Sequence, residues 1–295
     1  MLFGTTGTAR ALGPDGSSIW IVGTVRIMLG AITLWACAPR LPRRAGATPR
    51  KIAVPLVVGS VGAAIYQPAF CAGVEHAGVA VGTVVALGTG PVAAGAIDVL
   101  IRRRPPSKRF IAGTIVMMCG VGALVSSQSS GNSTHTTVDL AGIGAAVAAG
   151  IGYALYAQAT SMLIDRGIHP TSALAAQFTG ASVLLLPCMI IAIIFGASPA
   201  NIATASGVLM LAHLGVVTAG VAYVLYGWGV RVLGAATAVS ITLVEPLTAG
   251  IAALIVLNEQ LTATGWFGAV TILAGLSIVV RRQSASEPST GERPG

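Results

Sequence analysis

The stretch VEPLTAGIAALIVLNEQL, Val244 to Leu261, decides the fold class of this chain. It is apolar over most of its length, yet it places a carboxylate, Glu245, directly before Pro246. A charge is costly in an apolar environment, and a proline removes a backbone donor and interrupts a helix. Of the 295 residues, 54% are hydrophobic and only 9% are charged, whereas a soluble domain has roughly 25% charged residues. The sequence therefore predicts an integral membrane protein.

Apolar segments alternate with turn or charge clusters along the whole chain. A helix needs about 20 apolar residues to cross a hydrocarbon core of about 30 Å. The period-two alternation that marks a membrane β-barrel is absent from the sequence. We therefore predict an all-α bundle of ten transmembrane helices, at residues 1–13, 19–38, 52–74, 78–100, 110–127, 138–160, 172–196, 205–228, 235–257 and 264–280. The first segment is short for a span, which favours a start codon upstream of Met1.

Basic residues gather at the ends of the predicted spans rather than on a nucleic-acid-binding face. The net charge of +8 comes largely from APRLPRRAGATPRK (38–51), RRRPPSKR (102–109), Arg166, Arg231 and the pair at 281–282. These positions share one side of the membrane, and opposite loops such as SSQSSGNSTHTTVD (126–139) carry no Lys or Arg. An excess of Lys and Arg marks cytoplasmic loops. We expect both termini in the cytoplasm, the cytoplasmic membrane as location, and the lipid bilayer rather than nucleic acid as partner.

Cofactor, metal and enzyme signatures are missing from the sequence. The cysteines, Cys37, Cys71, Cys119 and Cys188, lie singly in four predicted spans and have no metal-ligand spacing. No phosphate loop, dinucleotide fingerprint, zinc-protease motif or nucleophile elbow occurs in a usable context. We expect no cofactor, no metal and no enzymatic activity.

The chain contains an internal repeat. An offset of 155 residues aligns GPVAAGA (90–96) with EPLTAGI (245–251), and AGTIVMMCGVGALV (112–125) with FGAVTILAGLSIVV (267–280). The predicted repeats are residues 1–127 and 138–282, followed by a disordered cytoplasmic tail at 283–295. Each repeat holds five spans, so the second copy enters the membrane in the opposite orientation. Inverted repeats are a device of secondary transporters, whose substrate and ion sites lie where helices of the two halves are interrupted.

Pro91 and Pro246 occupy matching positions in the two repeats. A proline within a helix removes one donor and frees the carbonyl four residues earlier, here at Leu87 and Thr242. We expect both helices to be broken at these prolines, and the breaks to mark the site of a substrate or coupling ion.

These motifs resemble the drug/metabolite transporter superfamily, specifically EamA-type ten-helix transporters. The resemblance rests on LFGTTGTA (2–9), VGTVRIMLGA (22–31) with its Arg26, the proline of the fourth span, and the long motif LVEPLTAGIAALIVLNEQLTATGWFGAVTILAGLSIVV (243–280). It covers roughly residues 1 to 282. It implies ten helices, both termini inside, and efflux of amino acids, other metabolites or drugs.

Charged and large polar residues within the spans are the candidates for a substrate or coupling-ion site. Arg26 and Glu245 are the two deepest charges, and either they form a structural ion pair or at least one binds substrate or a proton. The other candidates are Tyr66, Gln67, Tyr153, Gln158, Gln177, His213, Tyr223 and Tyr226. The alternative explanation for each tyrosine is interfacial anchoring or an interhelical hydrogen bond, and the alternative for His213 as a proton relay is a packing role. The function classes left open are a secondary exporter, a passive facilitator or channel, and a membrane subunit without transport.

Overall fold

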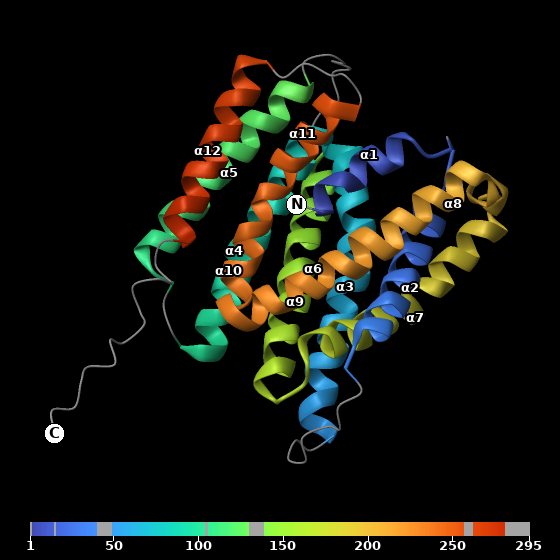
Figure 1. Cartoon of the computed structure of the whole chain (residues 1–295), viewed down its shortest axis with the longest axis horizontal. Helices are drawn as coiled ribbons and strands as arrows, with labels where there is room; N and C mark the ends of the chain where they lie inside the picture. The colour runs from blue at the N-terminus through green and yellow to red at the C-terminus, as the bar shows by residue number, and fades with distance from the viewer. Residues whose placement is uncertain are drawn as a thin grey trace, which may run out of the picture.

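The computed structural model describes residues 2–14, 16–39, 49–103, 106–129, 139–256 and 262–280, and in these residues it contains helices and no strands (Figure 1). Eight helical stretches in this part of the chain are long and apolar enough to cross a membrane. Six are single α-helices: α2 (Ile19–Cys37), α3 (Pro49–Ala77), α4 (Val79–Arg102), α5 (Lys108–Ser129), α6 (Leu140–Asp165) and α7 (Pro170–Ile194). The all-helical prediction is confirmed for the described residues.

The other two long stretches are interrupted. One joins α8 (Ala205–Ala212), the π-helical η3 (His213–Val221) and α9 (Ala222–Leu233). The other joins α10 (Ala235–Ile241), the 3₁₀ turn η4 (Thr242–Val244) and α11 (Glu245–Val256). Because π-helical segments and 3₁₀ turns inside helices commonly accompany functional sites, both interruptions direct attention to their neighbours.

The first and last predicted spans are shorter than the other eight. Residues near the N-terminus form η1 (Leu2–Gly4) and the seven-residue α1 (Thr5–Ala11), and α12 (Ala263–Val280) carries a shorter apolar stretch, Ala263–Val279. A further 3₁₀ turn, η2 (Pro199–Ala203), precedes α8. The structure thus supports eight spans, and the count of ten stays a prediction. The predicted tail at 283–295 lies outside the described residues.

The expectation of a helix break at Pro91 is wrong. α4 runs without interruption from Val79 to Arg102 with Pro91 buried inside it. Tight packing against α6 explains how the helix stays regular, since neighbouring helices support a proline within a membrane span. Only the second repeat has the expected break, in η4 directly before Glu245 and Pro246.

Glycines let the central helices approach until their backbones touch. A Cβ on Gly62 of α3 would lie 2.6 Å from the Gly152 carbonyl oxygen of α6, and a Cβ on Gly150 would lie 2.6 Å from the Ala86 carbonyl oxygen of α4. Small residues at such crossings are the usual means of close packing between membrane helices. The contacts fix α6 between α3 and α4, and thereby the positions of the side chains that α6 points inward.

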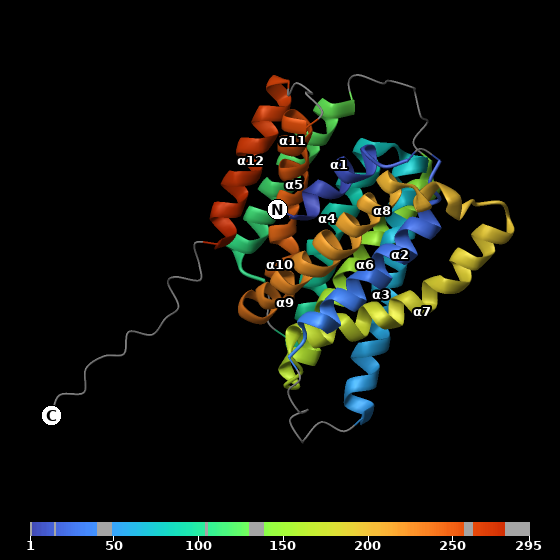
Figure 2. The ribbon, with the colours of Figure 1, turned by 45° about the vertical axis from the view of Figure 1, so that its right-hand side comes forward.

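The bundle extends between two outer helix groups. Figures 1 and 2 show α5 and α12 together at one edge, with α2, α7 and α8 at the opposite edge and α3 and α6 between them. α1 packs against α11 and η3, which connects it to both interrupted stretches. The two interrupted stretches therefore border the same interior region as α1, α2, α3 and α6.

Candidate functional site

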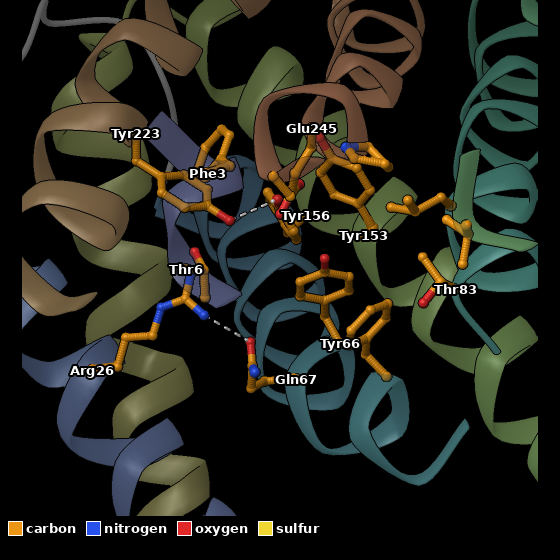
Figure 3. A pocket seen from close by; sticks show the side chains of 15 residues that line it. Phe3, Thr6, Arg26, Tyr66, Gln67, Thr83, Tyr153, Tyr156, Tyr223 and Glu245 are labelled. Atoms are coloured by element: carbon orange, nitrogen blue, oxygen red, sulfur yellow. Dashed lines mark hydrogen bonds between the residues drawn. The ribbon is translucent and has the colours of Figure 1, made fainter. Parts of the chain in front are cut away.

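A cavity of about 210 Å³ lies in this interior region (Figure 3). Its walls come from η1, α1 to α6, α9 and α11, so most of the bundle contributes to it. The lining residues are Phe3, Thr6, Arg26, Tyr66, Gln67, Phe70, Thr83, Leu87, Val125, Tyr153, Tyr156, Tyr223, Glu245, Pro246 and Ala249. A cavity at the meeting point of many helices is a common location for a small-molecule site.

The five tyrosines of the chain form one cluster, and four of them, Tyr66, Tyr153, Tyr156 and Tyr223, line this cavity. Ring centroids lie 5.5 Å apart for Tyr66 and Tyr153, 5.1 Å for Tyr153 and Tyr156, and 5.7 Å for Tyr223 and Tyr226. Such separations are favourable for edge and tilted aromatic contacts. The cluster gives the cavity a stiff aromatic wall that also carries hydroxyl groups.

Two tyrosine hydroxyls of α6 form hydrogen bonds to other helical elements. The hydroxyls of Tyr156 on α6 and Tyr223 on α9 are 3.1 Å apart. The Tyr153 hydroxyl lies 2.6 Å from the Thr242 hydroxyl, which itself donates to the Val239 carbonyl at 2.7 Å. Because a threonine hydroxyl has one proton, Tyr153 must be the donor to Thr242. This bond ties α6 to the 3₁₀ turn η4 beside Glu245.

Arg26 and Glu245 face the cavity from opposite walls (Figure 3). The Arg26 Nη1 atom donates to the Gln67 Oε1 atom at 3.3 Å, while its buried Nε atom has no hydrogen-bond partner in the described residues. No ion pair joins Arg26 to Glu245 in this part of the chain, although the Arg26 charge acts electrostatically on the Glu245 carboxylate. The two deepest charges are therefore held apart across a space rather than locked together.

Seven of the predicted site residues line this cavity: Arg26, Tyr66, Gln67, Tyr153, Tyr223, Glu245 and Pro246. Tyr226 lines a second cavity of about 210 Å³, which Glu245 also lines. The remaining four predicted residues are elsewhere in the bundle.

Pro91 lies within α4 and does not line the central cavity. Gln158 donates to the Ala94 carbonyl at 2.8 Å, and the amide of fully buried Gln177 lies 3.2 Å from the Thr160 hydroxyl, so both connect helices outside the cavity. His213 lies 2.8 Å from the Thr5 hydroxyl, at an apolar groove between α1 and α8.

Several lining residues were not predicted from the sequence. Tyr156 follows Tyr153 by three positions, a spacing that puts both on one face of a helix, so this one was open to prediction. Phe3, Thr6, Phe70 and Thr83 carry no comparable signal, because single aromatic and hydroxyl residues are common in apolar helices. Among the described residues, no group of three His, Cys, Asp or Glu side chains could hold a metal ion.

A model of the EamA-like transporter family matches residues 1–126 and 140–281. The chain belongs to the EamA-like transporter family. Membership confirms the resemblance carried by the motifs around Arg26 and Glu245. Together with the names of the relatives, it indicates a membrane transporter, and the family suggests a small-molecule substrate and a lipid environment.

Curated relatives of this EamA protein are also transporters by name. The uncharacterized transporter YwfM of Bacillus subtilis (strain 168) is 28% identical over 289 residues, covering 97% of this chain and 93% of YwfM. The uncharacterized inner membrane transporter YicL of Salmonella typhimurium is 27% identical over 234 residues, covering 78% of this chain and 74% of YicL. A crystal structure with 14% identity reaches a TM-score of 0.76 over 97% of this chain and 95% of its own, which shows a likeness of fold.

Proposed function

We propose that this EamA protein is a secondary active transporter that exports small polar metabolites across the cytoplasmic membrane. Amino acids or related compounds and drugs are the candidate substrates, and protons are the candidate coupling ion. The observation that carries the proposal is the separation of Arg26 and Glu245 across an aromatic cavity inside the bundle. Unpaired charges inside a membrane span are costly, so their retention on opposite walls of a cavity favours ligand binding over a structural ion pair.

Alternating access supplies the mechanism in this proposal. Two inverted five-helix repeats, residues 1–127 and 138–282, rock against each other around the cavity. The cavity draws on both repeats, since Arg26, Tyr66 and Gln67 come from the first and Tyr153, Tyr223 and Glu245 come from the second. A relative movement of the two halves would therefore change the access and the shape of the same site.

The proposal places both termini in the cytoplasm, because the basic clusters at 38–51 and 102–109 then lie inside. We expect reporter fusions after Gly295 and within residues 102–109 to report a cytoplasmic location, and a fusion at Ser129 to report an external one. Topology reporters active only on one side of the membrane make the measurement. An external reading for the C-terminal fusion would contradict the orientation and the inverted repeat together.

Transport itself is tested with a toxicity screen followed by reconstitution. Cells that overexpress the protein should grow at concentrations of one or more amino acids, nucleobases or amphiphilic drugs that stop control cells. Purified protein in liposomes should then exchange the labelled protective compound, and a proton gradient should drive its net accumulation. The control is a matched preparation of empty liposomes.

The two competing functions give different results in these assays. A passive facilitator would equilibrate the labelled compound but would not accumulate it when a proton gradient is applied. A membrane subunit without transport would show neither protection nor exchange at the same protein abundance.

A further inference from the structure

An aromatic and cationic cluster lies at the end of α9, away from the central cavity. The Arg231 guanidinium carbon is 5.2 Å from the centre of the Trp228 ring. The His169 ring, at the start of α7, meets the same indole edge-on at 5.6 Å and 82°. The long helical stretch that contains α9 ends at Leu233, and α7 begins at Pro170. The cluster therefore lies at the ends of two apolar spans.

The charge of this cluster comes from Arg231. Its side chain is exposed and has no carboxylate partner among the described residues. Burial and the neighbouring Arg231 guanidinium lower the pKa of His169 below its ordinary value, so its ring is neutral at neutral pH. The edge-on contact with His169 fixes the indole, and the indole supports the guanidinium in a cation–π contact. An anion approaching this helix end would meet one positioned cation.

An apolar stripe leads away from the cluster along α9 and the end of η3. Val221, Leu225, Trp228 and Val232 are 42%, 62%, 44% and 72% exposed. Their spacings of four, three and four residues put them on one face of a helix. From Val221 to Trp228 an α-helix rises roughly 10 Å, about a third of a hydrocarbon core of about 30 Å. The stripe below Trp228 thus has room for the part of an acyl chain that lies next to the headgroup.

We propose that this face of α9 is a binding site for one anionic phospholipid. The phosphate group binds Arg231 beside Trp228, and an acyl chain lies along the stripe from Trp228 to Val221. A tryptophan at a membrane interface next to a basic residue suits a lipid headgroup, and the adjoining apolar stripe distinguishes a lipid from a free anion.

The lipid site has a consequence for the cavity. The buried face of α9 carries Tyr223 and Tyr226, and Tyr223 bonds to Tyr156 across the cavity. A lipid bound to the outer face of α9 would therefore stabilise the position of the helix whose inner face lines the candidate site. This inference goes beyond the proposed transport function and does not depend on it.

Native mass spectrometry of the purified full chain tests the lipid site without a transport assay. The test compares how strongly the protein retains phosphatidylglycerol and phosphatidylcholine that carry the same acyl chains. The wild-type protein should retain one phosphatidylglycerol in preference to phosphatidylcholine. Arg231→Gln should lower that affinity about fivefold, the effect of one basic residue near an anionic surface. Trp228→Leu, which keeps an apolar side chain, should also weaken retention.

The matched control is Lys108→Gln, which removes a basic residue from the start of α5 at another helix end. It should leave the preferential retention unchanged. Equal retention by wild type and Arg231→Gln, or equal retention of the two lipids, would overturn the proposal. Displacement of the lipid by soluble glycerol phosphate at comparable concentration would also overturn it, because the site would then be one for free anions. Thermal unfolding in phosphatidylcholine checks that the variants are folded.

Discussion

Glu245→Gln is expected to reduce gradient-driven efflux to the level of empty liposomes while substrate exchange continues. Glutamine keeps the shape of the side chain and most of its hydrogen bonding but cannot release a proton. Exchange needs the site to bind substrate and to change its access, whereas net efflux also needs the coupling proton. The measurement compares labelled exchange with accumulation under a proton gradient, at equal protein abundance.

Arg26→Gln should have a different effect from Glu245→Gln. If the guanidinium holds an anionic group of the substrate, its loss removes a charge-assisted interaction worth about 1.5–3 kcal/mol. The substrate concentration for half-maximal transport should then rise roughly ten- to hundredfold. The contact of Arg26 with Gln67, rather than with Glu245, supports separate roles for the two charges.

The double mutant distinguishes these roles from a structural ion pair. A structural pair predicts that each single change lowers abundance, because it strands the other charge, and that removing both charges restores abundance. Separate roles predict normal abundance in both single mutants. They also predict that the double mutant does not recover gradient-driven efflux. Full recovery of efflux in the double mutant would refute a coupling role for Glu245.

Apolar length predicted most of the helices. Eight predicted spans correspond to long helical stretches, because about 20 apolar residues have few alternatives to crossing the membrane. The prediction of a break in α4 at Pro91 was wrong. The repeat alignment shows which residues correspond, but it does not show how neighbouring helices support each proline. In the second repeat, a break at Thr242–Val244 does precede the corresponding motif, which begins at Glu245.

Position along a helical span was easier to predict than side-chain direction. Gln158 and Gln177 lie within long helical stretches, as expected, but they point toward neighbouring helices and form bonds there. Arg26 and Gln67 also lie within long helical stretches, and they point into the cavity. A single sequence gives the register of a residue along its helix, whereas the direction of its side chain depends on how α2, α3, α6 and α7 pack. The clustering of the five tyrosine rings has the same origin.

Pro246→Ala is expected to impair transport strongly while leaving insertion and abundance close to normal. Pro246 is the second residue of α11, where the lack of a backbone donor costs little, and the 3₁₀ turn before it separates α11 from α10. Alanine restores the donor and favours a continuous helix from Ala235 to Val256. Straightening would rotate Glu245 relative to the cavity and strain the bond between Tyr153 and Thr242.

Pro91→Ala is the matched control, since it makes the same chemical change at the corresponding place in the first repeat. Pro91 lies in an unbroken helix and outside the cavity lining, so its replacement should leave transport near the wild-type rate. Exchange assays on both variants at equal abundance make the comparison. Wild-type transport by Pro246→Ala would show that the break is incidental to the site. Equal loss in both variants would show that transport depends on a property shared by the two prolines, such as helix flexibility, and not on the placement of Glu245 by η4.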